Sequence, residues 1–252
     1  MIEFVSKPNL PHSAAGVLLG EKYLNLLEEP LITLGVTVYP IPDNPFVDER
    51  LSGHADLSVL HAGDRIIFAA NYLLNSTFSE QMHSLGYELR YIEEAQSREY
   101  PNDCQLNLCS AGDYLVYSKA VSSNKVVNHF LQQQGSKPID IKQGYVKCSI
   151  CVVDENSVIT ADAIAAKKLK ENGMNVLQIS AGNIELAGFP YGFIGGSTFK
   201  LSEKQLVFTG KLDRHPDKES ILSFIESRGI SAVYLTDRDI FDVGSILPIY
   251  EK

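Results

Sequence analysis

Short apolar segments rich in β-branched and aromatic residues recur along the chain, and each is typical of a strand. Four of these segments follow a two-residue turn, and a fifth, MIEFVSK, opens the chain at residues 1–7. The four turns are Gly63-Asp64, Gly112-Asp113, Glu155-Asn156 and Glu203-Lys204. Another apolar segment precedes each turn, and the last such segment, GSILPIY, closes the chain at residues 244–250. The pattern predicts five hairpins, one of them formed by the two ends of the chain.

A helical segment follows each predicted hairpin, and a further short strand follows each helix. The helical segments end at glycine, which is a common helix stop. These glycines are Gly35, Gly86, Gly135, Gly173 and Gly229. Self-similarity at a fixed period indicates a repeat architecture. We therefore expect a single domain over residues 1–252, with units at 1–52 plus 242–252, 53–100, 101–143, 144–190 and 191–241.

The repeated order of strand, strand, helix and strand predicts an α/β fold in which five ββαβ units form a five-fold pseudosymmetric propeller. Pairing of the C-terminal strand with the N-terminal strand closes the ring in this prediction. Closure removes the exposed sheet edges that favour unwanted pairing. An open α/β sheet with accidental similarity between its hairpins is the alternative.

The register of the predicted first strands places several polar residues toward the centre of the ring. Residues two apart on a strand share a face. Counting back the same number of residues from each of the five turns gives equivalent positions on the five first strands, and positions two apart form three layers that face the centre. The polar residues in these layers are His54, Asp56, Asp103, Gln105, Asn107, Cys148 and Asp242. Burying such groups without pairing costs several kcal/mol. The pattern therefore favours a functional cavity over a packed apolar core.

Charge and composition narrow the choice of partners. The 252-residue chain has a formal net charge of −9, which disfavours nucleic acid, where a basic face is expected, and weakly favours a cationic ligand. No segment has the ~20 apolar residues of a membrane span, and none resembles a signal peptide. Four cysteines indicate a reduced, cytoplasmic protein rather than a disulfide scaffold. The sequence does not determine the oligomeric state.

Two motifs that resemble cofactor sites do not have the required spacing. GFIGGS, at residues 192–197, lacks the G-x-G-x-x-G spacing of a dinucleotide loop. Cys148 and Cys151, and likewise Cys104 and Cys109, would lie on opposite faces of predicted strands. We therefore expect neither a cofactor nor a metal.

Cys148 is the candidate nucleophile, with His54 as its base, and Asp56 would either orient the imidazole or bind a cation. A thiol needs a base or a lowered pKa to react well, and histidine carries protons near neutral pH. Asp103 and Asp242 would make a negative pocket for a cation, with Gln105 and Asn107 lining it. The alternative is that Cys148 is a small buried core residue and that His54 is structural.

Five ββαβ units in a ring resemble the pentein fold of guanidino-modifying enzymes such as arginine deiminase and agmatine deiminase. GHADLSV, at Gly53–Val59, is similar to that family's G-H-x-D motif. The resemblance implies that His54 is the general acid/base and that Asp56 binds substrate. AGNIEL, at residues 181–186, resembles the E-G-G-[DN] segment and implicates Asn183 in substrate binding. The implied reaction is attack of the Cys148 thiolate on a guanidinium carbon.

The chain also departs from that family. The family cysteine usually lies near the C-terminus, where this chain has Ser245, and Ala181 replaces the glutamate of the E-G-G-D segment. GYVKCSICVVDENSVIT, at residues 144–160, and GFIGGS resemble a family of uncharacterised bacterial proteins assigned to the same fold. A cysteine-dependent hydrolase or transferase of a guanidino or amidino compound is one expectation. A non-catalytic protein that binds a macromolecular partner, as a ribosome anti-association factor of this fold does, or a small cation is the other.

Overall fold

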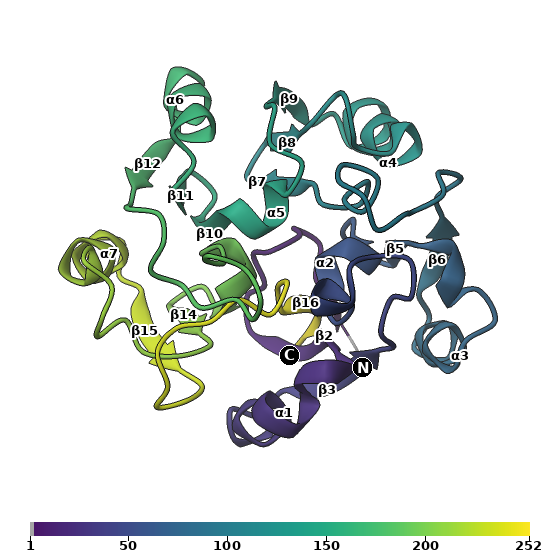
Figure 1. The fold of residues 1–252 in the computed structure, drawn as a ribbon, viewed down its shortest axis with the longest axis horizontal. Coiled ribbons are helices and arrows are strands. Elements are labelled where there is room, and N and C mark those ends of the chain that lie inside the picture. Colours follow the sequence, from purple (N-terminus) through teal and green to yellow (C-terminus); the bar gives the residue numbers. More distant parts are fainter. Residues whose placement is uncertain (1–2) are drawn as a thin grey trace.

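The computed structural model describes residues 3–252, which form a mixed α/β fold of five small sheets. Four sheets have three strands and one has four. The sheets surround a common centre, and the longer helices lie outside them (Figure 1). No helix among residues 3–252 has the length and apolar character needed to cross a membrane.

One sheet illustrates the repeated unit. Strand β4 (Val59–His61) runs antiparallel to β5 (Ile66–Ala69), which runs parallel to β6 (Glu88–Tyr91). Helix α3 (Thr77–Ser84) connects β5 to β6. The turn between β4 and β5 has positive φ at Gly63 (92°) and Asp64 (48°), the backbone that a tight two-residue hairpin requires.

Three further sheets repeat this order of two antiparallel strands, a helix and a parallel strand. The first comprises β7 (Cys109–Ala111), β8 (Tyr114–Tyr117), α4 (Asn124–Asn128) continued by η4 (His129–Gln133), and β9 (Lys137–Asp140). The second comprises β10 (Ile150–Asp154), β11 (Ser157–Thr160), α6 (Ala163–Glu171) and β12 (Asn175–Gln178). The third comprises β13 (Thr198–Ser202), β14 (Gln205–Phe208), α7 (Lys218–Glu226) and β15 (Ser231–Tyr234).

The sheet that contains both ends of the chain has the order β1-β16-β2-β3. The C-terminal strand β16 (Leu247–Glu251) pairs antiparallel with β1 (Glu3–Phe4) on one side and with β2 (Ala14–Gly20) on the other. Strand β2 then runs parallel to β3 (Thr37–Ile41). Segment η1 (Glu21–Tyr23) and helix α1 (Leu24–Thr33) connect these two strands.

The prediction that residues 1–7 form the second strand of this unit is wrong. Strand β2 occupies that place, because its seven residues are all buried and its apolar side chains fill the centre of the sheet. The opening segment contributes only the edge strand β1, whose Glu3 is exposed. Met1 and Ile2 of the same predicted strand lie outside the described residues.

The segments nearest the centre are short helical turns rather than the predicted strands. Helix α2 (Ala55–Ser58), helix α5 (Val146–Ser149) and the 3₁₀ turn η5 (Gly195–Ser197) precede β4, β10 and β13. So short a turn leaves its first N–H groups without a partner inside it. Other segments accept them: the N–H of Asp56 donates to the Gly244 carbonyl, and those of Lys147 and Cys148 donate to Asn107. Two more 3₁₀ turns, η2 (Glu49–Leu51) and η3 (Asn71–Leu73), lie in the connections.

The apolar core lies between each sheet and its neighbours. Leu18 of β2 is fully buried in a cluster with Ile41, Ile67 and Ile249, which joins the first and second sheets. We predict that Leu18→Ala lowers the free energy of unfolding by about 2–5 kcal/mol, because it leaves a cavity. Ile164→Ala, at a position 53% exposed, should change it by less than about 0.5 kcal/mol. Urea unfolding measures both, and equal effects would contradict this packing.

Candidate active site

Asn107 fixes the position of Cys148. Its Oδ1 accepts the backbone N–H groups of Lys147 (2.7 Å) and Cys148 (3.2 Å), which lie in the single turn α5. Its Nδ2 donates to Cys148 Sγ at 3.3 Å and to the Asp56 carbonyl oxygen at 3.3 Å. One buried amide therefore holds both the backbone and the thiol of Cys148, beside Asp56.

Asp56 is the hydrogen-bond partner of the thiol. Cys148 Sγ donates to Asp56 Oδ2 at 3.0 Å, and Ser245 Oγ donates to the same oxygen at 2.6 Å. Behind Ser245, the Nζ of Lys147 donates to Ser245 Oγ at 3.2 Å and to the Gly195 carbonyl at 3.3 Å. Asp56 is only 1% exposed, and its other oxygen, Oδ1, has no partner.

His54 completes a cluster of three functional groups. One ligand atom from each of His54, Asp56 and Cys148 lies within 4.8 Å of the others. His54 is buried and its Nε2 has no hydrogen-bond partner. The cluster combines a nucleophile, a carboxylate and an imidazole, and the same three atoms could ligate a divalent cation such as Zn²⁺.

Burial determines the protonation of these groups. Desolvation lowers the pKa of His54 to about 4, so that the imidazole is neutral at pH 7. Desolvation and the charge of Asp56 raise the pKa of Cys148 well above its ordinary value, and desolvation also raises the pKa of Asp56. Without a ligand, the thiol is therefore protonated and donates to Asp56. The sequence predicted His54 as the thiol's base, whereas the structure gives Asp56 that contact.

A pocket of about 220 Å³ opens onto Cys148. Its polar lining comes from His54, Cys148 and Asp242. The remaining lining is apolar or aromatic and comprises Leu51, Tyr145, Leu186, Phe189, Pro190, Tyr191 and Phe193. The arrangement suits a small ligand with a cationic end and an apolar end.

Asp242 is the carboxylate that lines this pocket. Its Oδ2 accepts the Phe193 N–H at 2.8 Å and its Oδ1 accepts the Gly244 N–H at 2.8 Å. Desolvation raises its pKa to about 6. A Cβ at Gly196 would lie 2.0 Å from Asp242 Oδ1, so this glycine is required for the close approach of the two segments. The neighbouring Gly195 is crowded by backbone, because a Cβ there would lie 2.3 Å from the Lys147 carbonyl oxygen.

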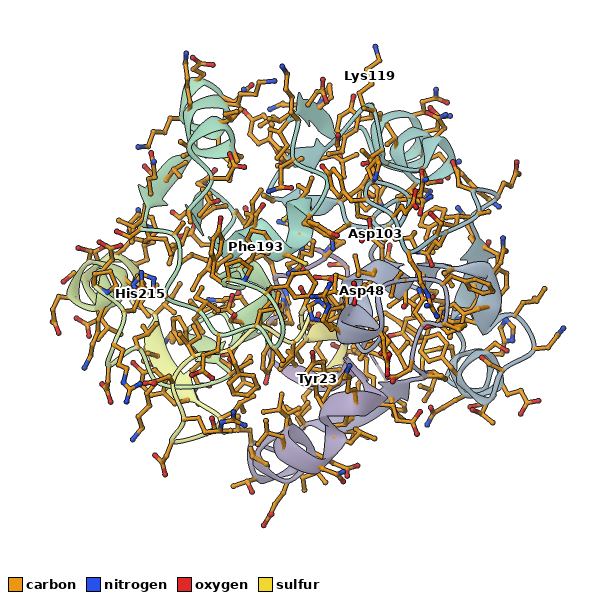
Figure 2. The ribbon with its side chains drawn as sticks, in the orientation of Figure 1. Tyr23, Asp48, Asp103, Lys119, Phe193 and His215 are labelled. Carbon is orange, nitrogen blue, oxygen red and sulfur yellow. The ribbon has the colours of Figure 1, made fainter. Side chains whose placement is uncertain are left out.

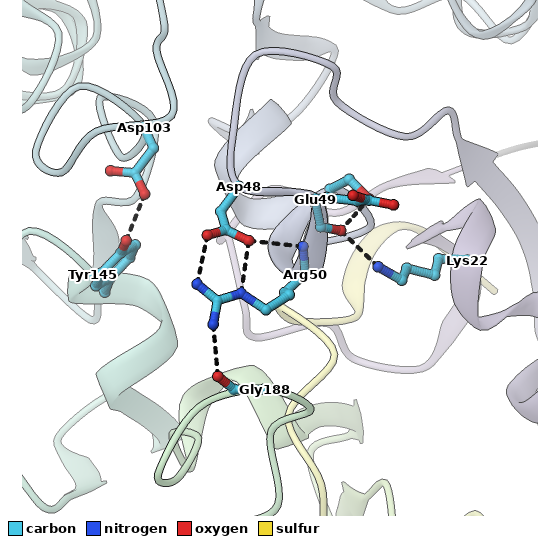
Figure 3. Close-up of polar contacts among 8 residues, drawn as sticks. Lys22, Asp48, Glu49, Arg50, Asp103, Tyr145 and Gly188 are labelled. Atoms are coloured by element: carbon cyan, nitrogen blue, oxygen red, sulfur yellow. Dashed lines mark hydrogen bonds and ion pairs between the residues drawn. The ribbon is translucent and has the colours of Figure 1, made fainter.

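Arg50, next to the pocket residue Leu51, joins two segments (Figure 3). Its Nε and Nη2 donate to Asp48 at 2.9 and 2.6 Å, and its Nη1 donates to the Gly188 carbonyl at 2.8 Å. The guanidinium also packs 4.2 Å from the centre of the Phe189 ring. The hydrogen bonds from Arg50 lower the pKa of Asp48 to about 2.

Four residues expected to bind substrate, Asp103, Gln105, Asn107 and Asn183, do not line the pocket. Asp103 accepts a hydrogen bond from the Tyr145 hydroxyl, which occupies one of its oxygens (Figure 3). Gln105 donates to the Ala95 carbonyl. Asn183 is exposed and donates to the nearby Ala181 carbonyl. The structure brings together His54, Asp56, Asn107, Cys148 and Asp242, and of these Asn107 bonds to Cys148 without lining the pocket.

Sequence reasoning missed the aromatic wall of the pocket. Tyr145 and Phe193 lie with ring centres 6.2 Å apart, and Tyr191 lies 6.3 Å from Phe193. Figure 2 shows Phe193, with Asp103, Asp48 and Tyr23, around the centre of the molecule. The sequence feature that could have predicted this wall is the aromatic and glycine-rich segment AGFPYGF at residues 187–193. Its apolar residues have neither the period of a helix nor that of a strand.

The raised pKa of Asp242 predicts how binding of a cation depends on pH. A carboxyl with a folded-state pKa near 6 destabilises the fold as pH rises from about 4 to 6, and only its ionised form attracts a cation. The affinity for methylguanidinium should therefore rise about tenfold between pH 5 and pH 7. Calorimetric titration measures this, and Asp242→Asn should bind weakly without that rise. The same rise in Asp242→Asn would assign the titration to another group.

Comparisons with known proteins support the fold. A family model described as "Family of unknown function (DUF6873)" matches residues 19–247. No curated protein matches the chain. Among solved structures, the chain is similar to DDAH from Pseudomonas aeruginosa complexed with citrulline, with 11% identity, a TM-score of 0.55, and 88% of this chain and 92% of that one covered.

Two further structures give a similar result. Inosamine-phosphate amidinotransferase from Streptomyces griseus has 13% identity and a TM-score of 0.57, with 93% and 91% of the two chains covered. Agmatine deiminase from C. jejuni with substrate bound has 12% identity and a TM-score of 0.56, with 100% and 97% covered. All three have the pentein fold, and the chain shares it. Identities this low show the fold alone.

Proposed function

The chain belongs to a family of unknown function (DUF6873), and we propose from its site that it is a cysteine-dependent hydrolase or transferase acting on the guanidino or amidino group of a small molecule. The observation that carries this proposal is the convergence of Cys148, Asp56 and His54 within 4.8 Å. Two of them, Cys148 and His54, line a pocket that also contains the Asp242 carboxylate.

The proposal includes a closed five-fold ring around this pocket, built from the five expected units. It is supported by the origin of the site residues. His54, Asn107 and Cys148 each precede the first strand of their own sheet, η5 precedes β13, and Asp242 precedes β16. Each of the five sheets thus has its entering segment at the site. The pairing of β16 with β1 and β2 connects the last unit to the first.

Binding of a cation would activate the thiol. A guanidinium beside Asp242 and Asp56 offsets the negative charge that keeps the Cys148 thiol protonated, because an opposite charge nearby favours a thiolate. The thiol proton then passes along the existing hydrogen bond to Asp56 Oδ2. The sulfur forms a bond to the central guanidinium carbon, one C–N bond breaks, and the leaving nitrogen takes that proton.

The second step removes the carbon from the sulfur. Neutral His54 accepts a proton from water as the water oxygen attacks the carbon, which is work that an imidazole with a free ring nitrogen can perform. The C–S bond breaks, the proton held by His54 restores the Cys148 thiol, and the product leaves as a neutral urea once the second proton of the attacking water has passed to solvent. An acceptor amine in place of water gives amidino transfer by the same route.

The fold neighbours support this substrate class. Their names describe an amidinotransferase and an agmatine deiminase, and the DDAH structure contains citrulline. These are hydrolytic and transfer reactions at the same kind of carbon, which one cysteine can catalyse through a common covalent intermediate.

One observation favours a second candidate, a protein that binds a cation without reacting. The thiol is buried and hydrogen-bonded to Asp56, and Ser245 occupies the C-terminal place where the resembling enzymes have their cysteine. In this candidate, Cys148 would only fill space and Asp242 would bind the cation.

Alkylation of Cys148 separates the two candidates. At pH 7 we expect a cationic haloacetamidine to label Cys148 at least about 100-fold faster than a neutral haloacetamide, after correction for their rates with a free thiol. Cys104, Cys109 and Cys151 are buried and serve as controls in the same peptide map. A corrected ratio near one, with Cys148 as slow as the other three, would exclude the enzyme and leave the binding protein.

A further inference from the structure

The composition of the pocket identifies a narrower substrate class. We propose that it takes a monocationic guanidine or amidine whose substituent is apolar or aromatic and carries neither a carboxylate nor a second cation. That the ligand reacts rests on the proposed function. That the pocket selects this class of ligand rests on its lining alone.

The first argument is the chemistry of the lining. Seven of the ten residues around the pocket are apolar or aromatic, and Asp242 is its one carboxylate. Because Asp242 and Cys148 fix where the cationic group lies, the rest of the ligand lies against Tyr145, Tyr191 and Phe193. Aromatic rings favour both an apolar substituent and the face of a planar cation.

The second argument is the absence of a free positive charge. Within residues 3–252, no lysine or arginine lines this pocket. Arg50 is nearby but is committed to Asp48, the Gly188 carbonyl and the Phe189 ring. Lys22 donates to the Glu49 carbonyl. Figure 3 shows this contact and the contacts of Arg50 with Asp48 and Gly188.

Lys147 offers no alternative partner for a ligand carboxylate. Its Nζ lies behind Ser245, bonded to Ser245 Oγ and the Gly195 carbonyl, and the residue does not line the pocket. A carboxylate on a ligand that fills the pocket would therefore lie there without a counter-charge, and a second ammonium would lie against apolar side chains. Both arrangements are unfavourable.

Size sets a third limit. The pocket holds about 220 Å³, and a cavity of ~150 Å³ holds one benzene ring. One ring or short branched alkyl group together with one guanidinium fits this space. Benzylguanidine has both parts and is the probe that we choose.

Calorimetric titration of Cys148→Ser, which keeps the pocket but removes the nucleophile, tests the ligand class. We expect benzylguanidine to bind at least about 30-fold more tightly than L-arginine or agmatine. Phe193→Ala should remove most of that preference while keeping the backbone N–H that holds Asp242. L-arginine or agmatine binding as tightly as benzylguanidine would overturn the class.

Leu186→Arg provides a gain-of-function test at the same pocket. The added cation should strengthen binding of L-arginine at least about tenfold and leave benzylguanidine no stronger. No gain for L-arginine in a folded Leu186→Arg protein would contradict the claim that a missing positive charge excludes carboxylates.

Turnover by the wild-type protein separates this inference from the proposed function. Selective binding of benzylguanidine without release of amine or ammonia would support the proposed ligand class and contradict the proposed enzymatic activity. Turnover of L-arginine with a kcat/KM equal to that of benzylguanidine would support the proposed enzymatic activity and contradict the narrower substrate class. Failure of all these guanidines to bind would overturn both.

Discussion

Asp56→Asn is expected to lower the rate at which the cationic haloacetamidine labels Cys148 at pH 7 by at least about 100-fold. Asparagine has nearly the same shape as aspartate, but it cannot take up the thiol proton that Cys148 Sγ shares with Oδ2 in a hydrogen bond of 3.0 Å. It also removes one of the two carboxylates that, in the proposed mechanism, hold the cationic group beside the thiol. Loss of a positioned proton acceptor typically costs 10²–10⁴ in rate. Peptide mapping over a time course measures the rate constant.

Asp103→Asn is the matched control for this prediction. Asp103 is also a buried carboxylate, but Tyr145 holds it and it does not line the pocket. Its replacement should change the labelling rate by less than about threefold. Equal losses in the two variants would show that labelling responds to the general charge of the centre, and an unchanged rate in Asp56→Asn would remove Asp56 from the mechanism.

His54→Gln is expected to reduce steady-state turnover by about 10²–10⁴ while a covalent adduct accumulates on Cys148. The reason is that Asp56 and His54 act in different steps of the proposed reaction. In the proposed mechanism the thiol proton goes to Asp56, so that attack on the substrate can proceed without His54, whereas the water step uses the His54 ring nitrogen that has no hydrogen-bond partner. Acid quench followed by peptide mass spectrometry measures the fraction of Cys148 that carries the adduct.

His61 is a suitable comparison for His54. It is also buried with its pKa lowered to about 4, but it does not line the pocket at Cys148. His61→Gln should neither trap an adduct nor reduce turnover beyond any loss of folded protein. Reduced turnover in His54→Gln with no adduct would instead place His54 in the first step.

The hairpins and helices could be predicted from the sequence because they depend on local patterns. Turn pairs such as Gly63-Asp64 specify a tight hairpin, and a glycine such as Gly173, with φ of 86°, stops a helix. The second strand of the first unit could not be predicted in the same way. Residues 1–7 and β2 are both apolar, and only tertiary packing makes β2 the central strand.

The central site was predicted in part and for an imperfect reason. His54, Asp56, Asn107, Cys148 and Asp242 do converge, although the first four belong to turns rather than to the predicted strands. Asp103 and Gln105 were included in the predicted site because we assumed that these segments are strands. In a strand, residues two apart share a face; the actual turns do not have that period.

Residues on connecting loops could not be derived from local patterns. Phe189 and Phe193 line the pocket because a connecting loop carries them there, and Arg50 contacts that loop at Gly188; no periodicity describes such a meeting. Asn183 was placed in the site by a short motif, whereas its side chain donates to the Ala181 carbonyl of its own turn. The aromatic lining on which we base the proposed ligand class therefore depends on long-range packing.

The central claim is that Cys148 becomes bonded to the carbon of a cationic ligand. The most direct measurement is peptide mass spectrometry of acid-quenched protein after incubation with benzylguanidine at pH 7, in the wild-type protein and in Cys148→Ser. We predict an amidino adduct on the peptide that contains Cys148, with amine or ammonia released by the wild type alone. Saturating binding with no adduct and no release, or equal release by Cys148→Ser, would contradict the claim.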